Sequence, residues 1–466
     1  MNILIQSLPL LIMPAVAAFI LLIGAMWRRI SGESLLIMAV AGLVAALFFG
    51  WQGFLAGTAS FPADIIFDKI FYLTVIIIAI ALALAMLVSY NYLAERKLPW
   101  PEYLALLLFA GFGAGLMAAG TDFIVLFIGL ETISIAAYVL AGYTRDGSSK
   151  EASIKYFLMG AFASAVLLFG IAFFYGATGS VLLSAAPINK LLMVLALALI
   201  ISGTAFKVAA FPFQWWTPDV YEGSPLPVTA FFATAVKAAA FIMLFRIVAG
   251  ISGGLGLKFE SLLIALSVAT MTFGNLAALF QENIKRMLAY SSIAHAGYML
   301  IAFVVLGKDA NLAGAALLFY ILAYIVMSMG AFGVLIYLSG GEKEFCNMPD
   351  VAGLGRRSPW LAAVFGLFLL SLAGFPPTAG FVAKFYLFKS AMAHGYVLLV
   401  IAAVINSLIS VYYYMRPVVA MYFGEFQQER SLPKIRYSVA GVLIFCAIFV
   451  IILGLAPATI LAILSH

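Results

Sequence analysis

The run from Ile70 to Leu93 reads IFYLTVIIIAIALALAMLVSYNYL and contains no charged residue. A helix of about 20 apolar residues crosses the hydrocarbon core of a bilayer. Only helices and closed barrels satisfy every backbone polar group in that environment. We therefore predict a transmembrane helix over Ile70–Leu93.

Similar apolar runs occur along the whole chain and predict about fourteen transmembrane helices. The further spans are Ile3–Trp27, Ser34–Trp51, Tyr103–Ala119, Phe123–Gly142, Tyr156–Tyr175, Leu191–Phe211, Pro227–Val248, Ser261–Phe280, Met287–Leu306, Leu312–Leu338, Trp360–Lys389, Tyr396–Tyr422 and Val439–Leu464. The predicted fold class is an all-α polytopic membrane protein.

The composition agrees with this prediction. Of the 466 residues, 65% are hydrophobic and 9% are charged, whereas about a quarter of the residues in a soluble protein are charged. Because much of any fold stays in contact with solvent, lipid must be the solvent for most of the outer surface. The net charge of +6 comes mainly from short loops and does not indicate a nucleic-acid partner.

The chain offers few side chains that could hold a redox centre. Its two cysteines, Cys346 and Cys446, cannot ligate an iron–sulfur cluster or form a disulfide framework. Three histidines leave little material for haem or a histidine-based metal site. We predict no cofactor and no metal in this chain. The first apolar run has no cationic segment before it, so we interpret it as a retained helix.

Basic residues are distributed unequally between the loops, which predicts the orientation of the chain. One alternate set of loops contains Arg28, Arg29, Arg96, Lys97, Arg145, Lys150, Lys285, Arg286, Lys343, Arg356, Arg357, Arg430, Lys434 and Arg436. The other set contains only Lys69, Lys190, Lys258 and Lys308. The asymmetry predicts that both termini lie on the outer side of a bacterial inner membrane.

Two segments interrupt the helical pattern. Phe211–Pro227 reads FPFQWWTPDVYEGSPLP and contains four prolines, and Gly374–Pro377 reads GFPP in the middle of a predicted span. Proline removes a backbone donor and ends or kinks a helix. Broken helices are tolerated at membrane depth where they line protein or a water-filled cavity, as they do in transporters. Both segments therefore indicate a transport function.

A weak internal repeat accompanies the two breaks. Thr132–Tyr138 reads TISIAAY and Ser292–Tyr298 reads SIAHAGY. Each predicted repeat holds five spans, and an odd number places the two copies in opposite orientations. We predict a single membrane domain over 1–466. It comprises three helices in 1–102, a first five-helix repeat in 103–250, a second, inverted repeat in 258–422 and a C-terminal helix in 437–466.

Four ionisable residues fall inside predicted spans: Glu131, Lys207, Lys237 and Lys384. One charged side chain at the bilayer centre costs at least about 2.5–3.5 kcal/mol. Four together would rival the stability of a whole domain, which is roughly 5–15 kcal/mol. Burial disfavours the charged form of a lysine and a nearby carboxylate favours it, so a lysine between these influences can exchange protons. We predict a proton relay, and the alternative is a set of static salt bridges.

Two more residues are candidates for the relay. His295 lies within a predicted span, one helical turn from the position that matches Glu131 in the repeat, and the alternative is a hydrogen-bonded packing residue. Lys155 lies near the cytoplasmic end of its span, where a relay role and a side chain that extends to the interface are both open.

Structural roles explain several other polar and aromatic residues. Arg246 lies near a span end, where its side chain can reach water. Asp219 and Glu222 can cap the helix that follows the first break. Trp215 and Trp216 are typical of interfacial anchors.

Five motifs resemble those of the antiporter-like membrane subunits of respiratory complex I, and most closely those of the subunit N group, which includes mitochondrial subunit 2. They are Lys155–Leu158 (KYFL), Phe206–Phe213 (FKVAAFPF), Trp216–Pro225 (WTPDVYEGSP), Pro227–Phe231 (PVTAF) and Ser371–Phe381 (SLAGFPPTAGF). The resemblance covers about Tyr103 to Tyr422. The pattern of a lysine followed by proline is shared with multisubunit sodium/proton antiporters.

The resemblance implies a role for each candidate residue. Glu131 and Lys207 would form the ion pair of an inner half-channel, and Lys237 would be the central relay. His295 would link the centre to Lys384, the proton site towards the outside.

The resemblance also implies partners. The chain would be a non-redox subunit of an NADH:quinone oxidoreductase, next to other antiporter-like and small membrane subunits. FMN, iron–sulfur clusters and quinone would be bound by partner subunits. The alternatives are a sodium/proton antiporter subunit without a redox driver, and a structural scaffold.

Overall fold

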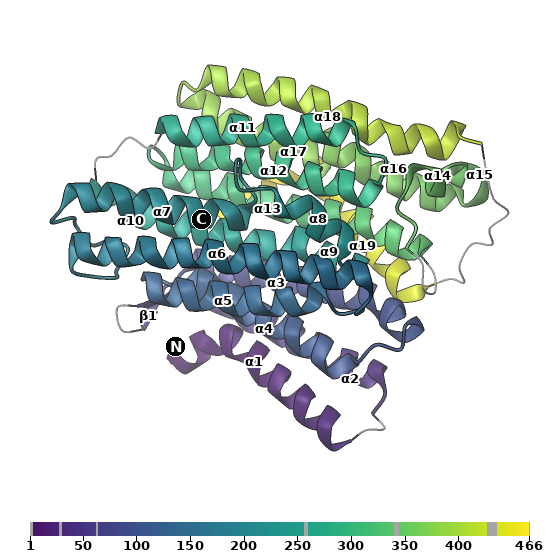
Figure 1. Cartoon of the computed structure of the whole chain (residues 1–466), viewed down its shortest axis with the longest axis horizontal. Coiled ribbons are helices and arrows are strands. Elements are labelled where there is room, and N and C mark those ends of the chain that lie inside the picture. Colours follow the sequence, from purple (N-terminus) through teal and green to yellow (C-terminus); the bar gives the residue numbers. More distant parts are fainter. Residues whose placement is uncertain are drawn as a thin grey trace.

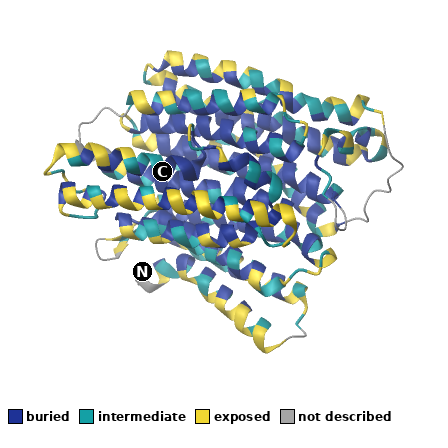
Figure 2. Ribbon diagram, in the orientation of Figure 1, coloured by how far each residue is buried: buried dark blue, intermediate teal, exposed yellow. Residues whose placement is uncertain are grey.

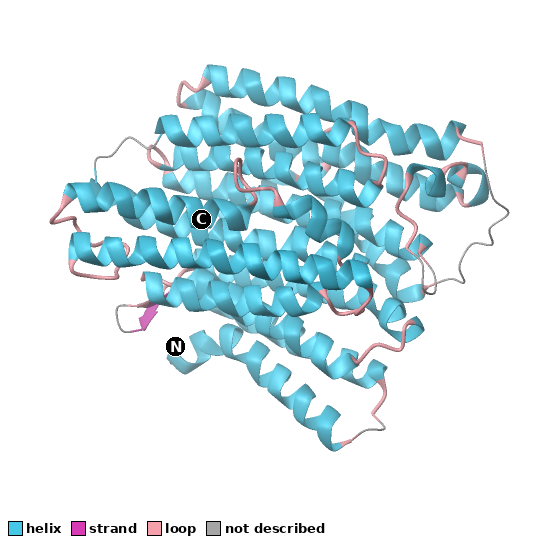
Figure 3. Ribbon diagram, viewed as in Figure 1, coloured by secondary structure: helices cyan, strands magenta, loops and turns pink. Residues whose placement is uncertain are grey.

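The computed structural model describes residues 3–27, 30–61, 64–255, 260–339, 344–425 and 436–465. These residues are almost entirely helical (Figure 3). The two strands among them, β1 (Ala59–Phe61) and β2 (Ile65–Phe67), form one short antiparallel hairpin. The predicted all-α membrane fold is confirmed.

The helices run roughly parallel to one another (Figure 1). The first half of the chain contains α1 (Ile3–Met26), α2 (Gly32–Ala56), α3 (Lys69–Glu95), α4 (Trp100–Ala119), α5 (Phe123–Ala141), α6 (Gly147–Thr178), α7 (Lys190–Val208), α8 (Trp216–Gly223), α9 (Leu226–Phe231), the π-helix η1 (Phe232–Val236) and α10 (Lys237–Leu255). The second half contains α11 (Glu260–Leu279), α12 (Ile284–Leu306), α13 (Ala310–Leu338), α14 (Met348–Val351), α15 (Leu354–Arg357), α16 (Pro359–Ala373), α17 (Ala379–Ala393), α18 (Val397–Phe423), α19 (Tyr437–Leu455) and α20 (Pro457–Ser465).

Thirteen helices among the described residues are long and apolar enough to cross a membrane. The predicted span Trp360–Lys389 is not among them, because it is divided into α16 and α17, of 15 residues each. The division follows from the sequence, since Pro376 and Pro377 cannot continue the helix. Gly374 adopts a left-handed φ of 93° at the end of α16, a conformation that costs glycine little. This pair completes the set of about fourteen predicted spans.

The centre of the molecule is formed by three of the spans, Leu226–Ile251, α12 and α13. Their most apolar stretches are 94%, 94% and 89% buried within the chain. Figure 2 shows the buried residues concentrated in the middle and the exposed residues on the peripheral helices. Lys237 and His295 lie on two of the three central spans, so the chain itself shields both residues from lipid.

The first three helices are fastened to the rest of the chain by two ion pairs. Both guanidinium nitrogens of Arg246 contact Asp68, at 2.7 and 2.5 Å, and its Nε donates to the Ala118 carbonyl at 2.7 Å. Arg436 contacts both carboxylate oxygens of Glu95, at 2.8 and 2.7 Å. The prediction that Arg246 extends to water is therefore wrong, because a carboxylate from another helix reaches it inside the protein.

Both predicted breaks are present. The first lies between α7 and α8 and the second between α16 and α17, and each contains a cis peptide bond before proline, at Pro212 and Pro377. The first break directly follows the fourth span of its predicted repeat, and the second break divides the fourth span of the other repeat. The inverted relation of the two repeats stays a prediction. Of the basic loop residues, Arg28, Arg29, Lys258, Lys343, Arg430 and Lys434 lie outside the described residues.

Candidate functional site

Lys207 is buried in the last turn of α7, where the helix dipole favours a cation. Its Nζ donates to the Ser134 hydroxyl at 2.9 Å and to the Tyr138 hydroxyl at 3.1 Å, both on α5. The same Nζ lies 5.6 Å from the centroid of the Tyr138 ring. The lysine is therefore held by neutral oxygens and an aromatic face.

Glu131 lies on the same helix as these two partners, α5. Its Oε1 accepts a hydrogen bond of 2.5 Å from the Ser164 hydroxyl of α6. Among the described residues, no ion pair joins Glu131 and Lys207, so the structure differs from the expected direct pair. Ser134 and Tyr138 follow Glu131 by three and seven residues, on the same face of α5, and it is they that contact Lys207.

Lys237 begins α10, directly after the π-helix η1. A π-turn inside a helix is rare and frequently occurs at functional sites. Nζ of Lys237 donates to the Ser292 carbonyl at 2.7 Å and also contacts the Ser292 hydroxyl. Lys237 is 4% exposed, so its two contacts to α12 are made in the protein interior.

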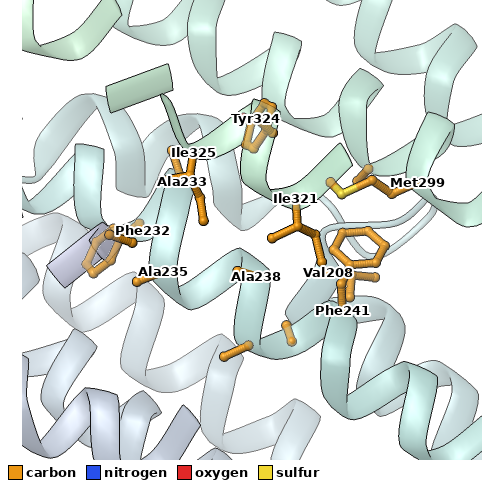
Figure 4. Close-up of a cluster of buried hydrophobic side chains, with 14 of the residues drawn as sticks. Val208, Phe232, Ala233, Ala235, Ala238, Phe241, Met299, Ile321, Tyr324 and Ile325 are labelled. Atoms are coloured by element: carbon orange, nitrogen blue, oxygen red, sulfur yellow. The ribbon is translucent and has the colours of Figure 1, made fainter. Parts of the chain in front are cut away.

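Apolar side chains surround this part of the chain. Ala233, Ala235 and Ala238, which flank Lys237 in sequence, belong to one buried cluster with Ile321 and Met299 (Figure 4). Apolar walls favour hydrogen bonds over contacts with bulk water and raise the cost of an unpaired polar group. Ser292 is therefore the main polar partner available to Lys237.

His295 is buried one turn after Ser292 on α12. Its Nδ1 lies 2.7 Å from the Tyr320 hydroxyl and its Nε2 lies 3.2 Å from the Tyr414 hydroxyl. The Tyr414 hydroxyl also contacts the hydroxyl of Ser291, the residue before Ser292. Both ring nitrogens are thus engaged, and a short hydrogen-bonded chain leads from His295 back towards the partner of Lys237.

Lys384 lies on α17, just after the second break. Nζ of Lys384 donates to the Ala373 carbonyl at 2.9 Å and to the Ser407 hydroxyl of α18 at 3.0 Å. Ala373 ends α16, where carbonyl groups lack helical partners, so the break itself supplies this acceptor. Nζ of Lys384 also lies 5.0 Å from the centroid of the Tyr298 ring.

The lysines next to the two helix breaks have similar surroundings. Lys207 lies over Tyr138 and Lys384 over Tyr298. These tyrosines end the two echoed sequence segments, at matching positions. The two lysine–tyrosine contacts, seen in the structure, agree with the repeat predicted from the sequence.

A second polar chain leads from Lys384 to the centre. The Tyr298 hydroxyl accepts from Asn275 at 3.2 Å, and the other end of that amide accepts from Tyr413 at 3.0 Å. Tyr413 precedes Tyr414, which contacts His295. The structure thus brings Lys237, His295 and Lys384 into one polar region. Lys207 and Glu131 form a separate group on α5 and α7.

A charged cavity of about 200 Å³ lies at the ends of α6, α8 and α12. Lys155 pairs with Glu151 at 2.7 Å and with Asp219 at 3.2 Å. Arg286 pairs with Asp219 at 2.8 Å and with Glu222 at 2.7 Å. The prediction that Asp219 and Glu222 cap the next helix is wrong, because α9 has Pro225 at its N-cap and no side-chain cap hydrogen bond. Both carboxylates instead pair with cations.

Trp216 is buried, whereas Trp215 is 62% exposed. The Trp216 ring stacks on Tyr156 with centroids 4.5 Å apart, and its Nε1 donates to the Phe206 carbonyl at 3.0 Å. Trp216 is therefore a packing residue of the first break and not the interfacial anchor that we predicted.

The hydroxyl partners of the lysines were not predicted from the sequence. Ser134, Tyr138, Ser292 and Tyr414 are ordinary residues in apolar spans. Helical spacing from Glu131 would have identified Ser134 and Tyr138. Nothing local to Tyr414 indicates its contact with His295, because the two residues are 119 positions apart.

The sequence and the fold are similar to those of known proteins. The model of the family NADH:quinone oxidoreductase/Mrp antiporter, transmembrane, matches residues 120–410. NADH-quinone oxidoreductase subunit N of Trichlorobacter lovleyi is 40% identical over 463 residues, which cover 97% of this chain and 94% of that protein.

Solved structures agree. A chain of respiratory complex I from Thermus thermophilus is 33% identical with a TM-score of 0.84, and the match covers 97% of this chain and 98% of that one. A chain of the Mrp complex from Dietzia sp. shares the fold, with a TM-score of 0.84 at 20% identity over 100% of this chain and 97% of that one. The chain belongs to the NADH:quinone oxidoreductase/Mrp antiporter transmembrane family, as an antiporter-like subunit of the subunit N type in the NADH-quinone oxidoreductase complex.

Proposed function

We propose that this chain carries protons across the bacterial inner membrane on Glu131, Lys207, Lys237, His295 and Lys384, as a non-redox membrane-arm subunit of a respiratory NADH:quinone oxidoreductase. One observation carries the proposal. Among the described residues, none of Lys207, Lys237 and Lys384 forms an ion pair with a carboxylate. A set of static salt bridges does not explain them.

The number of partners also suits proton exchange. Each of the three lysines has two oxygen partners. An ammonium group has three N–H donors, and a neutral amine has two. Two acceptors match the two N–H donors of the neutral amine, and they leave the ammonium with a third N–H that can pass on a proton. Such a site can hold the lysine in either protonation state.

The proposed route begins at the charged cavity around Lys155, on the side of the basic loops. Glu131 and Lys207 form the inner group, and Lys237 takes the proton at the centre. His295 passes it through the polar region to Lys384, which faces the outer side together with both chain termini. The distribution of basic loop residues supports this sidedness.

The driving energy comes from partners in this proposal. Moving one proton against 100 mV costs about 2.3 kcal/mol. FMN, iron–sulfur clusters and quinone are bound by other subunits, and quinone reduction there drives the relay here. The subunit would contact antiporter-like and small membrane subunits within the bilayer.

A pair of lysines on α17 tests the proposal. Lys384 is buried and Lys389 is exposed, five residues further along the same helix. We expect Lys384→Met to assemble normally but to lower proton pumping by inverted membrane vesicles several-fold, and Lys389→Met to pump as the wild type does. Equal pumping by both variants would overturn the proposal.

A sodium/proton antiporter is the second candidate, because the Mrp chain shares the fold. That function would give sodium-dependent proton movement in vesicles that lack NADH and quinone. A purely structural scaffold is disfavoured, since apolar replacements of buried charges are often at least as stable.

A further inference from the structure

Lys285 is the fourth buried lysine among the described residues, and unlike the three proposed relay lysines it has a carboxylate partner. Its Nζ pairs with Oε2 of Glu344 at 2.8 Å and also donates to the Ser224 carbonyl. Lys285 is 1% exposed and lies in the first turn of α12, where the helix dipole disfavours a cation. Since its own helix does not stabilise the charge, the two oxygens from other segments do.

The Glu344 carboxylate joins three helices. Besides pairing with Lys285 of α12, it accepts at Oε1 from the Tyr92 hydroxyl of α3 and from the backbone N–H of Leu226, both at 2.9 Å. Leu226 begins α9, which has no side-chain cap from a neighbouring residue. A side-chain oxygen just before a helix usually accepts from its first N–H groups, but here the acceptor is 118 positions away. We call Glu344, Lys285 and Tyr92 the Glu344 clamp.

The clamp holds the start of the span that contains Lys237. The elements α9, η1 and α10 form one span, Leu226–Ile251. Lys237 lies eleven residues after Leu226 in this span. Because each helical residue adds a rise of about 1.5 Å, the position of the span start determines how far along the bundle Lys237 lies. The Ser224 carbonyl and the Leu226 N–H are both bonded by the clamp, so the start is held on two sides.

The clamp also holds α12, two turns before the residue that binds Lys237. Lys285 and Ser292 are seven residues apart, a spacing that places both on one face of α12. On this face α12 contacts the Lys237 segment twice, through Lys285 at the start and through Ser292 at Lys237 itself. One contact would allow two helices to slide past each other, whereas two contacts define their register.

We propose that the Glu344 clamp sets the position of Lys237 against Ser292, which makes Glu344 and Lys285 positioning residues of the proton relay. Its effect on pumping rests on the proposed function, whereas its effect on position does not. The 2.7 Å contact between Nζ of Lys237 and the Ser292 carbonyl leaves little tolerance. A slide of about 1.5 Å, the rise of one helical residue, would lengthen it beyond hydrogen-bond distance.

The Glu95–Arg436 pair provides a matched control. It too joins distant helices, α3 and the start of α19, and its side chains are 37% and 5% exposed, compared with 21% and 2% for Glu344 and Lys285. Neither partner lies on a helix that contains a proposed relay residue. An ion pair that only adds stability would behave as this one does.

Neutral double variants test the proposal without leaving an unpaired charge. In Glu344→Gln, Lys285→Met the link between α9 and α12 is lost, and we expect the assembled complex to pump several-fold fewer protons per electron in inverted membrane vesicles. Glu95→Gln, Arg436→Met should lower the melting temperature but pump as the wild type does. Lys285→Met alone is the milder variant, because Glu344 keeps its other partners, and it replaces the double variant if that complex does not assemble.

The outcomes separate the clamp from the proposed function. If the clamp variant pumps as the wild type does while Lys237→Met does not, the clamp has no role in pumping and the proposed function still stands. Equal losses of pumping in the clamp variant and the Glu95→Gln, Arg436→Met control would also overturn the inference, because they would show a general effect of lost stability.

The position of Lys237 is measured separately from pumping. Cryo-electron microscopy of the assembled complexes gives the distance from Nζ of Lys237 to the Ser292 carbonyl oxygen. We expect the contact to be lost in the clamp variant and kept in the control. An unchanged contact in the clamp variant would overturn the inference whatever the vesicles show. Normal pumping by Lys237→Met would contradict the proposed function, and the distance would still test the clamp.

Discussion

Each of the three proposed relay lysines, Lys207, Lys237 and Lys384, is held by oxygens that carry no formal charge. Serine hydroxyls contact all three, at Ser134, Ser292 and Ser407. A carboxylate at hydrogen-bond distance would favour the ammonium strongly, whereas a hydroxyl can accept from either form and can also donate. The serine hydroxyls therefore leave the lysine proton exchangeable and provide a neighbouring oxygen that can accept it.

Ser292 offers the sharpest test at this scale. Ser292→Ala removes one of the two oxygens that bind Lys237 and leaves the carbonyl in place. We expect normal assembly and a several-fold loss of pumping by inverted vesicles, because the proton loses its exit from Lys237. Ser390→Ala is the control, since the Ser390 hydroxyl is buried and bonds only within its own helix, to Leu387. A Ser292→Ala complex that pumps normally would show that the hydroxyl is not on the route.

The broken helices act as elements that supply backbone groups. An intact helix uses its carbonyls internally, and a helix end leaves up to four of them free. Lys384 uses one of these, the Ala373 carbonyl. The π-turn before Lys237 is a milder break of the same kind, in which one extra residue per turn alters the direction of the side chains that follow.

Close packing at the second break gives a stability prediction. A Cβ added at Gly380 would overlap the Ser371 carbonyl oxygen, whereas one added at Gly366 would meet no atom within 4 Å. We expect Gly380→Ala to lower the thermal stability of the complex, by about 1–3 kcal/mol if the backbone must shift. Gly366→Ala should be neutral or slightly stabilising, because it lies inside a helix. Equal melting temperatures for the two variants would contradict the close contact.

The helical spans and their breaks were largely predictable from the sequence, and the side-chain contacts between the helices were not. Hydropathy and proline determine where spans begin, end and break, so Ile70–Leu93 and the Gly374–Pro377 break could be predicted from the sequence alone. The lysines were identified because a charge inside a span is costly. Their partners depend on contacts between distant helices, which single-sequence periodicity does not encode. For the same reason, the pairing of Arg246 with Asp68 was missed.

At the scale of the whole molecule, the three central spans contain Lys237 and His295, and an ion pair connects them to the first three helices. The Arg246–Asp68 pair joins α3 to α10, and Arg246 also binds the end of α4. The pair therefore holds α10, the helix that begins with Lys237, against the first three helices.

A double-mutant cycle measures this connection. Both side chains are partly buried, at 11% and 20% exposure, so Asp68→Asn should destabilise the complex by less than the roughly 3–5 kcal/mol of a fully buried pair. We expect Arg246→Gln to cost a similar amount and the double variant to cost less than the sum, since contacting residues couple. Thermal unfolding of the purified complex reports the values. Strict additivity would mean that the pair contributes nothing to stability.

The central claim is that Lys237 carries protons between the two halves of the relay. The most direct measurement is the number of protons pumped per electron by inverted membrane vesicles with Lys237→Met, with quinone reductase activity and assembly recorded in the same preparation. We expect an assembled complex whose proton-to-electron ratio and coupled quinone reduction both fall. An assembled complex with an unchanged ratio and unchanged quinone reduction would show that Lys237 is structural and would contradict the account.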